Sequence, residues 1–224
     1  NNSADNDEKE DLLFHDEKEE DAYEWTWSIC QAQMKLFAAG GIHYLDQLLL
    51  DHPPPGIKNS CRYIRDQWRA LEEMVIKYGQ VRSLAVSNFS PIQLDCLLHQ
   101  LVQIKPVVNQ LPYSVAYHRH HHDIIQVNQQ RGVLVQAWSP LGGSNNKFND
   151  EIRAACANVG GKYGKSFAQV ALRWILQKGA AFTTHSTKRE HMEENLDIFD
   201  FELSPQDMAY LDSLATVSSS TSMM

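Results

Sequence analysis

Polar and aromatic side chains follow each of five short apolar segments of this sequence. Amide, hydroxyl, imidazole and carboxylate groups can orient a polar ligand, and an indole ring can stack on a planar one. At the carboxyl ends of parallel strands, such groups form the rim where ligands bind. One polar residue after a strand is also typical of a turn or a helix cap, but five such groups favour a binding site. The groups are Asp51-His52, Ser87-Asn88-Phe89, Asn109-Gln110, Trp138-Ser139 and Thr184-His185-Ser186.

The elements that must position these groups alternate between strands and helices. The apolar segments predict five strands, at residues 48–50, 81–86, 106–109, 133–137 and 180–184. Apolar residues at steps of three and four predict helices before, between and after them, over residues 27–39, 61–78, 91–101, 122–130, 150–159 and 166–178, and two more after residues 187 and 204. This alternation predicts an α/β fold with parallel strands, a partial (β/α)8 TIM-type barrel of about five strands with surrounding helices.

Helix starts are marked by capping residues. A Ser followed three residues later by Gln forms a capping box, and a Pro after the cap suits the first helical turn. The expected caps are Ser90 with Gln93, Asp150, Ser166 with Gln169, Thr187 with Glu190, and Ser204 before Pro205.

Charge divides the chain unevenly. Of a net charge of -8, residues 1–24 hold 11 acids and 2 lysines, so the remainder is close to neutral. We expect an acidic, disordered tail over residues 1–24, a barrel portion over 25–214 and a frayed end over 215–224. A near-neutral body argues against nucleic acid as a partner, and no apolar run is long enough to span a membrane.

The four cysteines are widely spaced and form no CxxC pair. This usage fits a compartment in which thiols stay reduced, and no signal peptide is visible in residues 1–20. We therefore expect a cytoplasmic protein.

Five segments in order resemble the aldo-keto reductase family, between about residues 42 and 214. They are Gly79 to Phe89, Val108-Asn109-Gln110, Ala137 to Gly142, Gly164 to Trp174, and Glu194-Asn195 with Phe199-Asp200-Phe201. The resemblance implies an oxidoreductase that uses NADP(H), with NAD(H) as a second option, to reduce aldehydes or ketones.

The resemblance also implies roles for individual residues. Ser87, Asn88 and Gln110 match groups that bind the nicotinamide carboxamide, and Trp138 matches the ring that stacks on the nicotinamide. Ser139 and Leu141 match residues near the pyrophosphate. The residues that match the segment for the adenosine 2'-phosphate and adenine are His185, Ser186, His191, Glu194 and Asn195.

Two positions in that last segment depart from the family. His185 and His191 stand where the family has Lys and Arg, which carry permanent charge for a phosphate. The preference for NADP is therefore expected to be weakened, unless Lys188 or Arg189 substitutes.

The catalytic residues depart further. The family uses a Tyr, a Lys, an Asp and a His, and the first three have no counterpart here, since Tyr23 matches poorly. In an ungapped register Asp51 takes the position of the His, and a slip of one residue puts His52 there; we prefer the ungapped register. Whether the chain is an active enzyme is left open by the sequence, as are its substrate and oligomeric state.

A run of histidines, His118 and His120 to His122, resembles a metal site only superficially. Ligands for zinc converge from separated positions, so we predict a solvated loop and no metal. The leading hypothesis is the second part of an NADP(H)-dependent carbonyl reductase. The alternative is a non-catalytic barrel that binds a nicotinamide nucleotide, and a third hypothesis is a truncated product with no stable function. Open sheet edges predict self-association, or coverage of the gap by the N-terminal helix.

Overall fold

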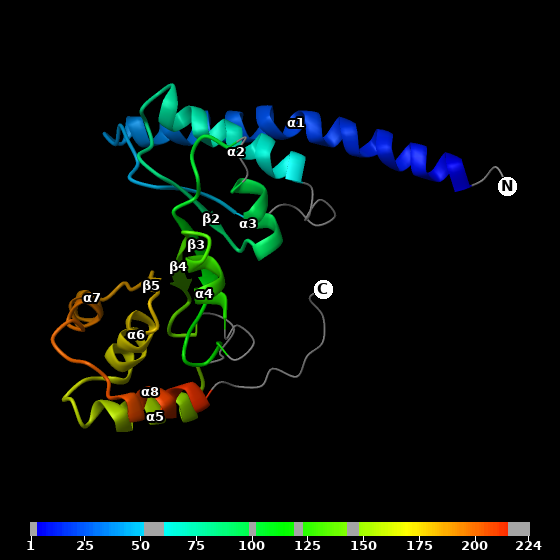
Figure 1. Cartoon of the computed structure of the whole chain (residues 1–224). Coiled ribbons are helices and arrows are strands. Elements are labelled where there is room, and N and C mark those ends of the chain that lie inside the picture. Colours follow the sequence, from blue (N-terminus) through cyan, green and yellow to red (C-terminus); the bar gives the residue numbers. More distant parts are fainter. Residues whose placement is uncertain (1–3, 52–60, 99–101, 119–122, 143–147, 215–224) are drawn as a thin grey trace. The chain divides into compact units, whose positions relative to one another are not determined.

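The computed structural model describes residues 4–51, 61–98, 102–118, 123–142 and 148–214, and the side chains of its first helix from Ala22 onward. The chain forms two compact units, Asn1–Val108 and Asn109–Met224 (Figure 1). Both contain strands and helices in alternation, as the sequence predicts. The proposed division into tail, barrel portion and frayed end stays a prediction.

The strands of the first unit are β1 (Leu48–Leu50) and β2 (Leu84–Ser87). They pair in parallel, with Leu48 opposite Leu84 and Leu50 opposite Val86. All four residues of β2 are buried, so this strand lies in the interior. It begins three residues later than predicted, and Ser87 is its last residue.

Helix α1 (Ala4–Ala39) packs against α2 (Cys61–Ile76) in the first unit (Figure 1). The Tyr23 hydroxyl donates to Glu73 Oε1 over 2.8 Å, which joins the two helices. The end of α1 is as predicted: Gly41 adopts a φ of 82°, which glycine tolerates at a helix end. Its start is earlier than predicted, so α1 includes most of the acidic segment.

Helix α2 buries Ile64 and Trp68 completely. The Trp68 indole N–H donates to Ile104 O over 2.7 Å, and Glu72 Oε1 accepts from two backbone amides, Gln103 N and Ile104 N. Helix α3 (Pro91–Leu97) begins with the predicted capping box of Ser90 and Gln93. Each helix is therefore fixed by contacts of its own.

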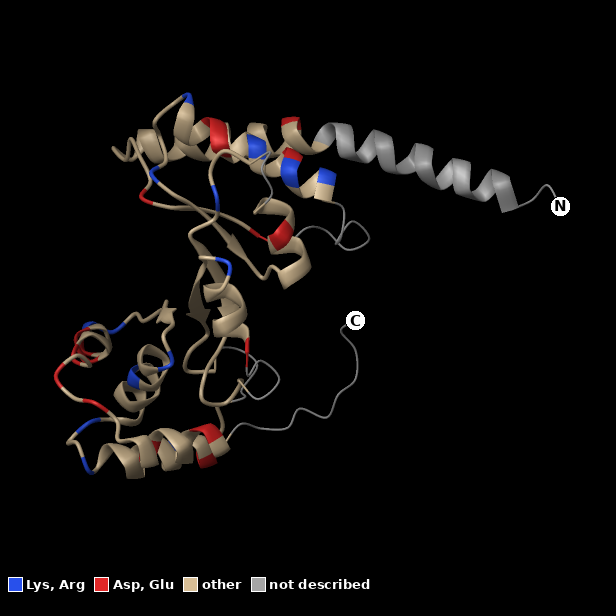
Figure 2. Cartoon of the chain, viewed as in Figure 1, with Lys and Arg blue, Asp and Glu red and all other residues tan. Residues whose placement is uncertain are grey.

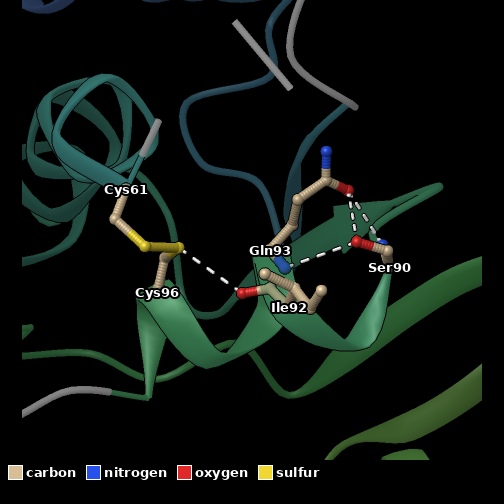
Figure 3. Close-up of a disulfide and its surroundings, with 5 residues drawn as sticks. All are labelled: Cys61, Ser90, Ile92, Gln93 and Cys96. Carbon is tan, nitrogen blue, oxygen red and sulfur yellow. Dashed lines mark hydrogen bonds between the residues drawn. A yellow bond between two sulfur atoms is a disulfide. The ribbon is translucent and has the colours of Figure 1, made fainter. Parts of the chain in front are cut away.

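A disulfide joins Cys61, the first residue of α2, to Cys96 of α3 (Figure 3). The two Cα atoms are 5.1 Å apart, within the usual range for a disulfide. Cys30 and Cys156 are buried and remain thiols. The expectation that all four cysteines stay reduced missed this pair, because a separation of 35 residues in sequence does not reveal closeness in space.

The second unit contains β3 (Val108–Pro112), which starts at the boundary, β4 (Leu134–Trp138) and β5 (Ala181–Phe182), in that order. β4 and β5 pair in parallel. Five helices accompany them: α4 (Ile124–Gln129), α5 (Asp150–Gly160), α6 (Phe167–Gln177), α7 (Arg189–Leu196) and α8 (Pro205–Ser213). The core between these elements includes Val135, Ala137, Ile152, Trp174 and Leu211.

Three of the five predicted caps are present, and two predictions were wrong. Helix α5 is capped by Asn149, whose side chain accepts from Ile152 N, and Asp150 is already inside the helix. At α7 the cap position is Lys188, with no side-chain cap. The Ser186 hydroxyl accepts from Lys188 N instead, a turn that removes the need for Thr187 as a cap.

A backbone hydrogen bond and a close backbone contact close the turn between α5 and α6. Lys165 N donates to Gly160 O over 3.0 Å, and a Cβ on Gly160 would lie only 2.2 Å from Lys165 O. Tyr163 in this turn donates to Asp207 of α8, and Ser204 N donates to the Tyr163 hydroxyl. The turn therefore anchors the start of α8.

Charged residues of both signs are interspersed over the described helices and turns of both units (Figure 2). This agrees with the near-neutral charge calculated for the chain after residue 24. Among the described residues, no helix has an apolar stretch sufficient to cross a bilayer.

Candidate functional site

Three predicted site residues meet at the carboxyl ends of β1 and β2. Asp51 follows β1, Ser87 ends β2, and Asn88 comes next. The Asn88 amide nitrogen Nδ2 lies 3.0 Å from both Asp51 Oδ1 and Ser87 Oγ, as a hydrogen-bond donor. The parallel register of the two strands brings the three together. His52 lies outside the described residues.

Asn88 owes its orientation to an uncommon backbone conformation. Its φ of 61° is in the left-handed region, which Asn tolerates better than most residues. The contact with Asp51 holds the Nδ2 end of the amide. A carboxylate accepts hydrogen bonds and has none to donate to a carbonyl oxygen. The geometry therefore fits Asp51 as a residue that positions Asn88.

Asn109 and Gln110 lie inside β3, whereas the sequence placed them at the end of a strand. Their side chains have partners there: Asn109 Nδ2 donates to Asn128 Oδ1 over 3.1 Å, and Gln110 Nε2 donates to Gln136 Oε1 over 2.6 Å. Polar side chains in a buried strand need hydrogen-bond partners, and these two bonds supply them. Gln136, on the neighbouring strand β4, thus orients the Gln110 amide.

Trp138 ends β4 and is followed by a tight turn. Ser139 has a φ of 52°, and Gly142 N donates to Ser139 O over 2.9 Å. Gly142 has a φ of 100°, and a Cβ at this position would lie 2.4 Å from Phe148 Cβ. The turn therefore requires glycine at position 142. It also fixes the backbone of Leu141, which lies between Ser139 and Gly142.

A cavity of about 290 Å³ in the second unit is lined by six of the predicted residues. They come from the turn after β4, the segment after β5 and helix α7, so distant parts of the sequence line one cavity. One hydrogen bond crosses the lining, from Asn195 Nδ2 to Thr184 Oγ1 over 3.5 Å. The six are Leu141, His185, Ser186, His191, Glu194 and Asn195.

Arg153 of α5 also lines this cavity, although it was not among the residues predicted from the sequence. Its guanidinium carbon is 4.8 Å from the centre of the Phe167 ring, and Nε donates to Phe148 O over 3.4 Å. No partner among the described residues takes the terminal guanidinium nitrogens. The helical pattern of α5 marks Arg153 only as an exposed position, so no local signal could have identified it.

Lys188 and Arg189, suggested from the sequence as substitute cations, are absent from the described lining. Arg189 Nε pairs with Glu193 Oε1 over 2.8 Å on the exposed side of α7. The permanent positive charge of the described cavity wall is therefore that of Arg153.

Contacts at its C-terminal end hold helix α7 in place. Gln169 Nε2 donates to the backbone oxygens of Glu194 and Asp197. Lys165 bridges Asp197 and Asp200, at 2.9 and 2.8 Å, and these contacts raise the pKa of Lys165 and lower that of Asp197. The cavity wall formed by α7 thus depends on the turn that precedes α6.

Tyr23 and His118, which the sequence also raised as candidates, both form hydrogen bonds to residues outside the lining of the cavity described above. Burial and the hydrogen bond to Glu73 raise the pKa of Tyr23 to about 12, which makes its phenol a weaker acid. His118 is buried, not in a solvated loop as predicted: its ring nitrogens lie 3.2 Å from Ser114 O and 3.0 Å from Asp212 O. His120 to His122 lie outside the described residues, and the described part contains no cluster of metal ligands.

A cavity of about 440 Å³ contains none of the predicted site residues. Its lining includes His118, Tyr113 and Asp212. Asp212 accepts hydrogen bonds from Trp174 Nε1 and Lys178 Nζ, at 2.9 and 2.7 Å. This network attaches the end of α8 to α6.

The chain is similar to known oxidoreductases. A profile of the Aldo/keto reductase family matches residues 15–216. An uncharacterized oxidoreductase, YtbE, from Bacillus subtilis (strain 168) is 35% identical over 174 residues, which are 78% of this chain and 57% of the relative. A glyoxal reductase of the same organism is 35% identical over 196 residues, 88% of this chain and 65% of the relative.

A solved structure shows the same fold. MGS-M4, an aldo-keto reductase enzyme from a Medee basin deep-sea metagenome library, superposes with a TM-score of 0.73 at 25% identity, covering 89% of this chain and 69% of that one. The chain spans less than two thirds of the length of these two curated relatives. Its five parallel strands and surrounding helices correspond to part of an aldo-keto reductase TIM barrel. From the family match, the motifs and the fold together, the chain belongs to the aldo/keto reductase family.

Proposed function

We propose that this chain is the cofactor-binding portion of an NADP(H)-dependent oxidoreductase that reduces the carbonyl group of aldehydes or ketones. The observation that carries the proposal is the cavity lined by Arg153, His185 and His191. Its walls suit the adenosine end of the cofactor, since they offer donors for a phosphate and the side-chain amide of Asn195 for an adenine.

Arg153 suits the 2'-phosphate in particular. Its guanidinium carbon lies 4.8 Å from the centre of the Phe167 ring and 5.9 Å from that of the Phe148 ring. No described residue takes its terminal nitrogens, which suits a bidentate contact with phosphate oxygens. Permanent charge at this position offsets the loss of the Lys and Arg that His185 and His191 replace. A preference for NADP(H) over NAD(H) follows, although NAD(H) should also bind.

At the nicotinamide end, Ser87, Asn88 and Gln110 would bind the carboxamide, and Trp138 would stack on the ring. The contacts of Asn88 with Asp51 and of Gln110 with Gln136 fix the direction of two of these amides. Ser139 and Leu141 would lie beside the pyrophosphate. The nicotinamide supplies hydride chemistry when bound, and the residues named here orient it.

The test is to replace Arg153 and measure binding of both cofactors by calorimetry. Arg153→Ala should weaken NADP+ binding roughly 10- to 100-fold, as expected for a charged hydrogen bond, and leave NAD+ binding within about two-fold. Arg189→Ala is the matched control, because Arg189 lies on α7 outside the described lining. Equal losses for both cofactors would exclude a contact with the 2'-phosphate.

A non-catalytic nucleotide-binding protein is the alternative function. It is favoured by the chemistry of Asp51 and Tyr23, because the first accepts from Asn88 and the second is bound to Glu73. Loss of a general acid usually costs about 10²–10⁴ in rate. Oxidation of NADPH with a reactive aldehyde, followed by its absorbance, separates the two functions. Turnover at the level of an intact family member, abolished by His52→Ala, would exclude the alternative.

The proposal also covers the binding partners of the chain and its location in the cell. The ligand is a small carbonyl compound, and we expect no nucleic acid or membrane partner and a cytoplasmic protein. Self-association through strand edges also stays a prediction, which sedimentation of the purified chain would test.

A further inference from the structure

The Cys61–Cys96 pair differs from the other two cysteines in its access to solvent. Cys96 is buried, whereas Cys61 is half-buried at the start of α2. Cys30 and Cys156 are both buried, and burial raises the pKa of each thiol, to about 12 for Cys156. A reagent in solution therefore reaches Cys61 first among the four.

The surroundings of Cys61 favour its reactive form. It is the first residue of a 16-residue helix, where backbone N–H groups without helical partners stabilise a thiolate. The first turn of α2 contains no acidic residue, and Arg62 follows directly. Thiolate is the form that attacks a disulfide.

When Cys96 is a thiol, a hydrogen-bond acceptor lies close to its sulfur. Its Sγ lies 3.5 Å from Ile92 O (Figure 3), a contact that is a hydrogen bond only when the sulfur has a proton. Reduction of the disulfide would therefore leave the buried sulfur with an acceptor close by, which lowers the cost of keeping a thiol there.

Neither helix depends on the disulfide for its position. Helix α2 is fixed by Trp68 and Glu72 through hydrogen bonds to the segment at residues 103–104. Helix α3 has its own capping box and buries Leu94 and Leu97 completely. The same packing holds the two sulfurs within reach of each other when they are reduced, so the bond can form again.

From these contacts we propose that Cys61 and Cys96 form a reversible thiol–disulfide site, whose oxidant is a low-molecular-weight disulfide such as oxidised glutathione and whose oxidised state stabilises the first unit. The Cys61 thiolate attacks one sulfur of oxidised glutathione, which forms a mixed disulfide and releases one glutathione thiolate. Cys96 then loses its proton to solvent and attacks Cys61 Sγ, which releases the second glutathione. Two cysteines are oxidised and one molecule of oxidised glutathione is reduced to two thiols. This site is independent of the proposed cofactor cavity.

The experiment equilibrates the whole purified chain in glutathione buffers of increasing oxidised fraction. Remaining thiols are then alkylated under denaturing conditions and located by peptide mass spectrometry. We expect Cys61 and Cys96 to lose alkylation together, in one transition that reverses with reduced glutathione. A pair that stays alkylated in every buffer, or that stays oxidised in millimolar reduced glutathione, would overturn the proposal. So would a product that stops at the mixed disulfide.

Variants separate this pair from the other cysteines. The double variant Cys30→Ala, Cys156→Ala should keep the full transition, because neither residue takes part. Cys61→Ser should leave Cys96 alkylated in all buffers. The thermal unfolding midpoint of the unmodified chain should be higher in the oxidised state, by at least several degrees, and Cys61→Ser should show no such difference. Equal midpoints for the two states of the unmodified chain would contradict the stabilising role, and that measurement needs no variant to fold.

Discussion

Asn88 donates a hydrogen bond from its side-chain amide to the carboxylate of Asp51, across the carboxyl ends of two parallel strands. The ungapped match to the family places Asp51 where a catalytic His is expected. This contact supports a different task, which we propose is to orient the amide that we assign to nicotinamide binding.

The first prediction follows from this contact. Asp51→Ala should weaken cofactor binding by roughly 3- to 10-fold, since it removes the acceptor of the Asn88 amide. Asp51→Asn should keep most of the affinity, because its carbonyl oxygen can still accept. Asp46→Ala is the control, since Asp46 lies before β1 and pairs with exposed Arg82. Identical losses for Ala and Asn at position 51 would favour a catalytic or charge-based role.

The second prediction concerns Trp138. Trp138→Ala should weaken NADPH binding by about 0.5–1.5 kcal/mol beyond the loss of buried area, because ring stacking is lost. Trp138→Phe should recover part of it. Binding is followed by quenching of tryptophan fluorescence, which Trp25→Ala, a change at an exposed position of α1, should leave intact. Quenching that survives in Trp138→Ala would place the nicotinamide elsewhere.

A third prediction concerns His185 in the 290 Å³ cavity. A lysine carries permanent positive charge for a phosphate, which an imidazole does not. His185→Lys should therefore raise the affinity for NADP+ more than that for NAD+, and should do so most in Arg153→Ala, where the other permanent charge is missing. Calorimetry with both cofactors measures this, and equal changes in the two affinities would remove His185 from the phosphate site.

The fourth prediction concerns stability in acid. Hydrogen bonds from Lys162, Tyr163 and Ser204 lower the pKa of Asp207 to about 2. Because the folded value is below the usual one of about 3.9, the carboxylate contributes stability above pH 4, and this is lost as the pH falls toward 2. Asp207→Asn should lower the free energy of unfolding at neutral pH by about 1–2 kcal/mol, a range reduced for the exposure of Lys162.

Urea unfolding at several pH values tests this fourth prediction. The difference between the unmodified chain and Asp207→Asn should shrink between about pH 4 and about pH 2. Glu202→Gln serves as the control, since Glu202 forms an ion pair in which its own side chain is 82% exposed. A pH-independent difference would show that the lost stability is not that of the ionised carboxylate.

Local sequence signals identified much of this fold. The capping boxes at Ser90 and Ser166 are present because both of their hydrogen bonds lie within four residues of chain. The cap at α5 was placed one residue late, since Asn149 and Asp150 are both good capping residues and only the backbone decides between them. The apolar segment at residues 106–109 also misplaced β3, whose polar residues Asn109 and Gln110 are satisfied by partners 19 and 26 residues away.

What sequence could not identify depends on distant contacts. The six predicted residues of the cavity were found through resemblance, residue by residue. Arg153 was missed because its role follows from where α5 packs. The Cys61–Cys96 pair and the burial of His118 were missed for the same reason, since each depends on a partner far along the chain.

In the closed turn between Gly160 and Lys165 there is room for a hydrogen atom at position 160 but not for a side chain. This restriction bears on the position of α7, and therefore on one wall of the cavity. Any larger substituent at Gly160 would push on Lys165, whose ammonium holds Asp197 and Asp200 beyond the end of α7. An inserted residue in this turn would move the same group. The exposed positions of α5 other than Arg153 have no part in this constraint, whereas the length of the connection that follows α5 is limited by the position of α7, which forms part of the cavity wall.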